Sequence, residues 1–233
     1  MIKLPDKRAI ASWAFYDFAN TIFSMNVISL YFALWVTVDH GGQDILYSIA
    51  LSSSMFAVAI SAPIFGTISD QTGRRCFPLA LLTIVSVLAT AFIGQTDQLW
   101  MGLFLFVIAN YCYQSALVFY NGMLPSVARQ SNVGLISGYG VALGYIGSIA
   151  GLLLVEPFVD DGGRSAAFLP TAVLFFAFAV PCFLFVKDLD PKPFNINVSK
   201  SFQTLKKTVS NTSNHLVLLK FFIVHFLILD VVN

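Results

Sequence analysis

The sequence has little charge for its length. Only 11% of its 233 residues are Asp, Glu, Lys or Arg, whereas 57% are hydrophobic and the mean hydropathy is +0.78. A soluble globular domain carries about 25% charged residues. The composition therefore excludes an ordinary soluble domain and predicts an integral membrane protein.

Several chemical motifs are also missing. Cys76, Cys112 and Cys182 lie in or beside apolar runs, without paired spacing or a neighbouring His. We expect these thiols to be reduced and buried, with neither a disulfide framework nor a metal site. No Gly-rich phosphate loop is present, so ATP is not the expected energy source. We expect no cofactor and no nucleic-acid partner.

Long apolar runs are abundant instead. Six of them cover residues 10–38, 45–69, 76–94, 99–123, 133–155 and 166–186. Each is close to or above the ~20 residues that a helix needs to cross a bilayer, and none alternates as a barrel strand does. A seventh run begins near Leu216 and is still apolar at Asn233. We predict an all-α membrane protein with six complete spans, and we expect the chain to stop inside a seventh.

The basic residues collect on one side of these spans. Twelve of the 13 Lys and Arg residues lie there, and Arg164 lies on the other side. The second side carries the acids Asp39, Asp44, Asp97, Glu156, Asp160 and Asp161. Because cytoplasmic loops are rich in Lys and Arg, we expect a multi-pass protein with a cytoplasmic N-terminus. We divide the chain into a six-span bundle (1–186), a cytoplasmic linker loop (187–215) and the start of a seventh span (216–233).

Three charged residues lie close together in the motif "GTISDQTGRR", residues 66–75, between the second and third runs. Gly66 can admit a neighbouring helix, and Asp70 can pair with a cation or accept hydrogen bonds from a helix N-terminus. Gly73 can turn the chain before Arg74 and Arg75. The simpler interpretation is a tight loop that follows the positive-inside rule.

Polar side chains recur at helical spacing in two of the runs. They are Asp17, Asn20, Ser24 and Tyr31 in the first run, and Asn110, Gln114 and Asn121 in the fourth. Each set shares one helical face. A polar face toward lipid is expensive, so we expect both faces to point into the bundle or a wet cavity. The amides either contact a substrate or form hydrogen bonds that hold the helices together.

Asp17 is the only acid inside the six runs. It can bind a cation, the amino group of a substrate, or a proton. The alternative is a carboxylate that lies near the cytoplasmic end, solvated or capping a neighbour. The fifth run carries a different feature, a stripe of glycines at Gly140, Gly144, Gly147 and Gly151, which predicts close helix packing.

The motif "GTISDQTGRR" resembles the signature loop of the major facilitator superfamily, and six spans before a basic loop are similar to the N-terminal half of that fold. The resemblance implies that Asp70, Arg74 and Arg75 are gate residues of a cytoplasmic latch. A narrower resemblance links "SWAFYDFANTIFS", "VFYNGMLPSVA" and "ISGYGVALGYIGS" to the vacuole-effluxer-like branch. That branch includes fungal vacuolar amino-acid effluxers.

We therefore expect a secondary active transporter of a small polar solute, with amino-acid efflux implied by the narrower resemblance. Its expected partners are a small-molecule substrate, a co- or counter-transported ion and the lipid bilayer. A bacterial protein of this kind is expected in the plasma or inner membrane, and a fungal one in the vacuolar membrane. An enzyme is disfavoured, because the runs hold no cluster of nucleophile and base. A non-transporting structural or sensory relative with the same fold stays open.

Overall fold

The structure is a computed structural model that describes residues 7–188, 191, 220 and 224; no strand occurs among them. The elements are α1 (Lys7–Phe23), η1 (Ser24–Tyr31), α2 (Phe32–Leu34), η2 (Trp35–Asp39), α3 (Asp44–Thr72), α4 (Cys76–Ile93), α5 (Leu99–Gly122), α6 (Leu124–Val127), α7 (Val133–Gly162), η3 (Arg164–Ala167) and α8 (Phe168–Phe185). The chain divides into two units, Met1–Pro193 and Phe194–Asn233. The description below concerns the first.

Six helices are long and apolar enough to cross a membrane: Lys7–Asp39, Asp44–Thr72, Cys76–Ile93, Leu99–Gly122, Val133–Gly162 and Arg164–Phe185. The prediction of an all-α membrane fold with six spans is thus confirmed. The expected seventh span and nearly all of the predicted linker lie outside the described residues.

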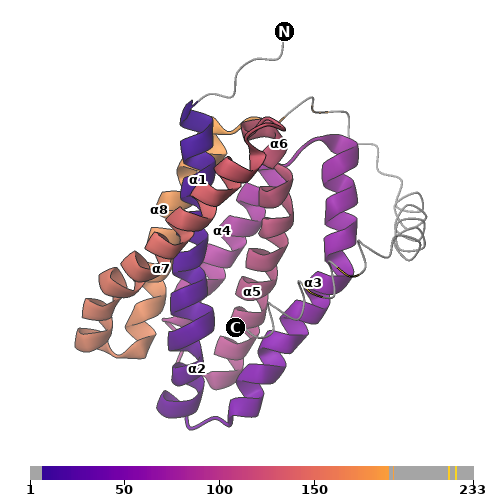
Figure 1. Ribbon diagram of the computed structural model, residues 1–233. Coiled ribbons are helices and arrows are strands. Elements are labelled where there is room, and N and C mark those ends of the chain that lie inside the picture. The colour runs from indigo at the N-terminus through magenta and orange to yellow at the C-terminus, as the bar shows by residue number, and fades with distance from the viewer. Residues whose placement is uncertain (1–6, 189–190, 192–219, 221–223, 225–233) are drawn as a thin grey trace. The chain divides into compact units, whose positions relative to one another are not determined.

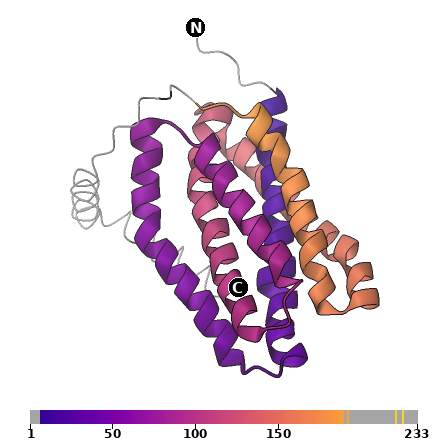
Figure 2. The same cartoon turned by 180° about the vertical axis from the view of Figure 1, so that it is seen from behind.

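Successive spans run in opposite directions, so the loops collect at two ends (Figure 1). The basic end carries Lys7, the α3–α4 loop with Arg74 and Arg75, Arg129, and Lys187. The acidic end carries the α1–α3, α4–α5 and α7–α8 connections, with the acids named above and Arg164. Pro63 lies inside α3, which changes direction along its length (Figures 1 and 2).

Large aromatic rings fill the space between the first span and α5. Trp13 stacks on Tyr120 with ring centroids 4.7 Å apart, and Phe23 stacks on Tyr113 at 4.5 Å. We call these four residues the aromatic seam. The Trp13 ring N–H also donates to the Tyr120 carbonyl at 3.2 Å, which fixes the orientation of the indole. The rings of the aromatic seam set the distance between α1 and α5.

The first span leaves α-helical geometry near its middle. Residues Ser24–Tyr31 and Trp35–Asp39 are π-helical, whereas the apolar run 10–38 predicts one ordinary helix there. The wider turn of a π-helix is common at functional sites. Asn26, fully buried in the first π-helical stretch, donates through its amide nitrogen to the Gly151 carbonyl of α7 and to the Thr171 hydroxyl of α8. One side chain thereby connects three spans.

Candidate functional site

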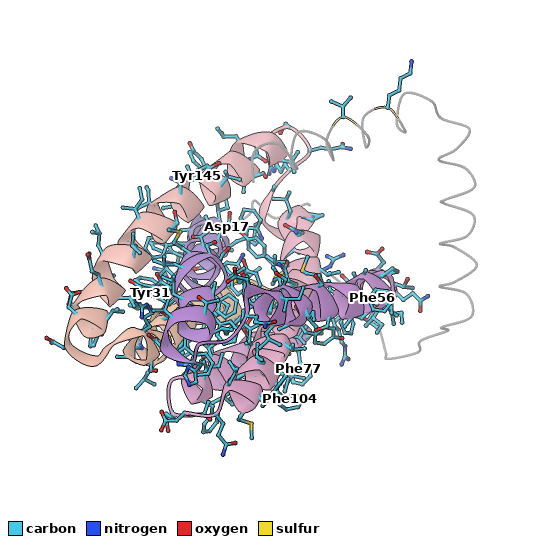
Figure 3. All side chains as sticks on the ribbon, turned by 90° about the horizontal axis from the view of Figure 1, so that it is seen from below. Asp17, Tyr31, Phe56, Phe77, Phe104 and Tyr145 are labelled. Atoms are coloured by element: carbon cyan, nitrogen blue, oxygen red, sulfur yellow. The ribbon has the colours of Figure 1, made fainter. Side chains whose placement is uncertain are left out.

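Asp17 lies on α1, beside α7 (Figure 3). A Cβ atom on Gly140 would stand 3.2 Å from the Asp17 Oδ2 atom, and one on Gly144 would stand 3.6 Å from it. The missing side chains therefore leave the space in which the carboxyl group of Asp17 fits. The carboxyl group is partly buried within the bundle.

No described residue forms a hydrogen bond or an ion pair with the Asp17 carboxyl group. A charged Asp near the centre of a membrane-spanning helix costs about 2.5–3.5 kcal/mol. An unpaired carboxylate at this place can be relieved by a proton or by a bound cation.

Asn20 lies one turn further along α1 and is 5% exposed. The Tyr113 hydroxyl of α5 interacts with the side chains of Asn20 and Ser24, while the Asn20 Oδ1 atom has no hydrogen-bond partner among the described residues. Of the predicted polar face of the first span, Asn20 and Ser24 thus face α5. Asp17 faces the glycines of α7.

The polar residues of α5 take three different environments. Asn110 is fully buried and donates to the Ser54 hydroxyl of α3 at 2.7 Å, so its side chain points toward α3. Gln114 is half-buried, and Asn121 is exposed near the basic end. Within the described part of the chain, no hydrogen bond joins Asp17 or Asn20 to these three amides.

The glycine stripe of α7 is the surface on which α1 packs. Gly140, Gly144, Gly147 and Gly151 are all buried. A Cβ atom on Gly147 would lie 2.4 Å from the Phe18 carbonyl oxygen, far closer than any real contact. The Thr21 hydroxyl uses this proximity and donates to the Gly144 carbonyl at 2.7 Å.

The α3–α4 loop turns at Gly73, whose φ of +63° lies in the left-handed region that favours glycine. Its N–H donates to the Ser69 carbonyl at 2.9 Å and closes the end of α3. Asp70 is 81% exposed, whereas Arg75 is 15% exposed, and their charged atoms are 3.8 Å apart. Such an exposed pair contributes little to stability. Asp70 therefore points outward, and most of its side chain is exposed.

Arg75 turns into the bundle instead. Its Nε–H donates to the Ser69 hydroxyl at 2.8 Å, and its side chain lies over Gly122, the last residue of α5. A cation at a helix C-terminus is stabilised by the helix dipole. Arg75 thus ties the loop to α5, while Arg74 is exposed and Gly66 has no described atom within 4 Å of its Cβ position.

Asp188 completes this loop, and sequence reasoning missed it. Its Oδ1 atom accepts the backbone N–H groups of Arg75 at 2.8 Å and of Cys76 at 2.9 Å. These are free donors at the start of α4, and a carboxylate there is favoured by hydrogen bonding and by the helix dipole. The only signal in the sequence is an acid three residues beyond the last helical residue of α8, Phe185.

The acidic end has its own connections. Arg164 forms an ion pair with Asp39, which joins the start of the last span to the end of the first. The two ring nitrogens of His40 lie 3.1 Å from the carbonyl oxygens of Trp35 and Asp97. Arg164, the one Lys or Arg at this end among the described residues, is therefore paired within the bundle.

Comparison with known proteins gives the family. The model of the Major Facilitator Superfamily matches residues 17–232. The chain is 28% identical to the uncharacterized MFS-type transporter YxiO of Bacillus subtilis, over 94% of this chain and 56% of the relative. It is 28% identical to an uncharacterized protein of Aquifex aeolicus, over 76% of this chain and 45% of the relative. It is 29% identical to the multidrug resistance protein MdtG of Proteus mirabilis, over 72% of this chain and 42% of the relative.

The chain thus spans about half the length of these curated relatives. Two of their names state no substrate and the third states multidrug resistance, so none supports the vacuolar amino-acid branch. The six apolar helices agree with the match, which covers nearly the whole chain. The chain belongs to the Major Facilitator Superfamily.

Proposed function

We propose that this chain forms the six-helix half of a secondary transporter that carries a small polar solute by alternating access. The observation that carries the proposal is the unpaired carboxyl group of Asp17 inside a membrane span. An ionisable residue within a span marks a substrate or ion pathway by default. The driving force is an ion gradient or the gradient of the substrate itself.

The exposure of the spans supports a second half that packs against this one. In the most apolar 18-residue stretch of each helix, 11% of the residues are buried in α3 and 28% in α7, compared with 56% in α5. α3 and α7 lie on opposite sides of Asp17, with Phe56 of α3 and Tyr145 of α7 pointing outward (Figure 3). In the proposed carrier, these two helices flank a central site that the second half completes.

The α3–α4 loop suits a gate. Asp70 is exposed and Gly66 is uncovered, so both are available to the second half in one access state. Arg75, which bonds to Ser69 and lies over the end of α5, and Asp188, which follows α8, hold the loop on this half. We place the basic end in the cytoplasm, following the distribution of Lys and Arg.

The substrate class rests on two indications. The resemblance to vacuolar effluxers favours amino acids, and the name of the Proteus mirabilis relative points to multidrug resistance. In either case Asp17 and Asn20 belong to the central site, and Gln114 of α5 contributes from the opposite helix. Asn110 and Asn121 stay candidates with a weaker basis, since one bonds to α3 and the other is exposed.

The gate is tested by Asp70→Asn in the complete carrier, reconstituted in proteoliposomes with labelled amino acids. A contact present in one access state biases the equilibrium by its own free energy, so transport should fall while insertion and thermal stability stay at the parent values. Thiol labelling at introduced cysteines reports the access states. Asp161→Asn, an exposed acid at the other end, is the matched control. Transport at the parent rate in Asp70→Asn would remove Asp70 from the gate.

The central site is tested by Asp17→Asn and Gln114→Ala in the same assay. Loss of uptake with unchanged thermal stability is the expected result. Equal loss of uptake and stability would instead assign these groups to helix packing.

A further inference from the structure

We propose that a groove between α1 and α7, at the basic end of the bundle, binds an anionic phospholipid. One acyl chain lies in the groove, and the ammonium group of Lys7 binds the phosphate. The groove has a volume of about 470 Å³, and it is lined by Lys7, Ile10, Ala11 and Ala14 of α1 and by Tyr139, Ala142, Leu143 and Ile146 of α7. Asp17 is not among these residues, so lipid binding here does not depend on the proposed transport function.

Small side chains create the groove. Ala11 and Ala14 of α1 and Ala142 of α7 end at their Cβ atoms, so the two helices leave a space that longer side chains would fill. Among the lining side chains, only Lys7 and Tyr139 carry a polar group. A volume between about 300 and 1,000 Å³ is typical of ligand sites, and an apolar cavity does not hold ordered water. Between two membrane spans, a lipid chain is the apolar group that can fill it.

The groove begins at the membrane surface and runs inward. Lys7 is the first residue of the first span, and its side chain is exposed. Ala14 follows seven residues later and therefore lies about 10 Å deeper along the helix axis. Tyr139, 54% exposed, is an aromatic residue of the kind that is enriched at membrane interfaces. A phospholipid has the same order, with its phosphate at the interface and its acyl chains below.

Lys7 gives the groove its preference for a negative headgroup. It forms no ion pair with any described residue. The same end of the bundle carries Arg74, Arg75, Arg129 and Lys187, so the surrounding charge favours anionic lipids as well. Each Lys or Arg near the membrane surface adds to the attraction for an anionic lipid. A zwitterionic headgroup places its own cation beside the phosphate and should bind less tightly.

The groove opens on the side of α1 that faces α8. Ala11 shares a helical face with Phe15 and Phe18, which follow it by four and seven residues. The rings of both phenylalanines pack against Phe178 of α8, with ring centroids 6.4 Å and 4.7 Å apart. The proposed second half instead packs between α3 and α7. The neighbour of the groove on the α8 side is therefore the bilayer.

The test compares three probes on the purified complete protein: dioleoyl phosphatidylglycerol, dioleoyl phosphatidylcholine and glycerol 3-phosphate. The two lipids share their acyl chains and differ in net charge, and glycerol 3-phosphate carries the phosphate without the chains. Native mass spectrometry of the delipidated protein measures the Kd for the first bound molecule of each probe. We expect phosphatidylglycerol to bind about fivefold more tightly than phosphatidylcholine. Glycerol 3-phosphate should give no adduct, because the buried chain supplies most of the binding free energy.

Two variants separate the charge from the groove. Lys7→Gln should lower the affinity for phosphatidylglycerol to that for phosphatidylcholine, and Lys7→Arg should keep the parent affinity. Arg129→Gln, an exposed cation at the same end outside the groove, is the matched control. Ala142→Phe places a ring in the groove and should weaken the binding of both lipids by about tenfold or more, since at least two methylene groups lose their site. Val141→Phe, exposed and outside the lining, should bind both lipids as the parent does.

Each outcome decides for or against the lipid site. Weaker lipid binding by Ala142→Phe at parent thermal stability supports it. Equal affinity of the parent for the two lipids, equal losses in Lys7→Gln and Arg129→Gln, or glycerol 3-phosphate bound as tightly as phosphatidylglycerol each overturns it. A less stable Ala142→Phe with unchanged lipid affinity would show that the second half covers the groove, which also overturns the proposal. The comparison of the two lipids on the parent needs no variant, so it stands even where a variant fails to fold.

Discussion

The α1–α7 contact and the α3–α4 loop both depend on glycine, and they use it for different purposes. In α7, a Cβ on Gly147 or Gly151 would collide with α1, so the missing side chain sets the distance between two helices. Near the end of α3, no described atom lies within 4 Å of a Cβ on Gly66, and in the loop that follows, Gly73 is needed for its positive φ. A glycine motif in a membrane protein therefore indicates a position that needs glycine. It does not indicate whether close helix packing or the backbone conformation is the reason.

The two regions also differ in what holds them. The α1–α7 contact is a packed surface with hydrogen bonds from Thr21 and Asn26 to α7 carbonyls. The loop is held by Asp188 on two backbone N–H groups and by Arg75 on Ser69. We expect the contact to fail when a methyl group is added, and the loop to weaken when a polar atom is removed.

The largest effect is expected from Gly147→Ala. The new methyl group would lie 2.4 Å from the Phe18 carbonyl oxygen and 2.6 Å from the Thr21 hydroxyl, so α1 and α7 must separate. Overpacking of this kind costs about 1–3 kcal/mol or more. The change should lower the thermal unfolding temperature of the purified protein by several degrees.

Gly138→Ala is the matched control, because it lies on the same helix with no described atom within 4 Å. Alanine is a better helix former than glycine by up to about 1 kcal/mol, so this variant should be as stable as the parent or slightly more so. Equal destabilisation by both changes would contradict a specific packing role for Gly147.

The next effect is expected from Asp188→Ala. It removes the acceptor of the Arg75 and Cys76 N–H groups at the start of α4. Loss of an N-terminal cap costs about 0.5–2 kcal/mol. The unfolding temperature should fall by less than in Gly147→Ala, and hydrogen exchange at the first turn of α4 should become faster. Unchanged exchange there would show that the cap contributes nothing.

Hydropathy predicted the fold well, because spans are marked by length and lack of charge. The six observed spans begin within three residues of the predicted runs. The fifth ends at Gly162 rather than 155, since backbone hydrogen bonding continues through the polar residues Asp160 and Asp161 after the apolar stretch stops. Hydropathy does not predict polar helical turns of this kind, because it reports only how apolar a segment is.

The site was less accessible to sequence reasoning. Helical spacing indicated the faces of Asp17 and of the α7 glycines, but not that they meet, because spacing says nothing of which helices are neighbours. The π-helical stretch Ser24–Tyr31 is bonded through Asn26 to α7 and α8, and the cap by Asp188 joins residues over 110 positions apart. Both are tertiary features without a local signature.

A smaller loss is expected from Gly73→Ala. An L-residue in the left-handed region costs about 1–2 kcal/mol, while alanine recovers part of this by restricting the unfolded chain. The unfolding temperature should drop by only a few degrees. Gly73→Asn tolerates the same φ better and should lie between the parent and Gly73→Ala. Equal stability of Gly73→Ala and the parent would mean that the loop adopts another turn.

Gly66→Ala should leave stability unchanged or slightly raised, because it lies in the middle of a helical turn of α3 with no described atom within 4 Å of the new methyl group. Its effect should lie in function: if Gly66 admits a helix of the second half, a methyl group there disfavours the access state in which the two halves close. Transport by the complete carrier should then fall several-fold at parent thermal stability. Gly134→Ala, equally uncovered near the start of α7, is the control and should transport as the parent does. Parent-rate transport in both variants would mean that Gly66 is a helical glycine without a packing partner. Gly66 would then differ from Gly147 because Gly147 packs against a neighbouring helix and Gly66 packs against none.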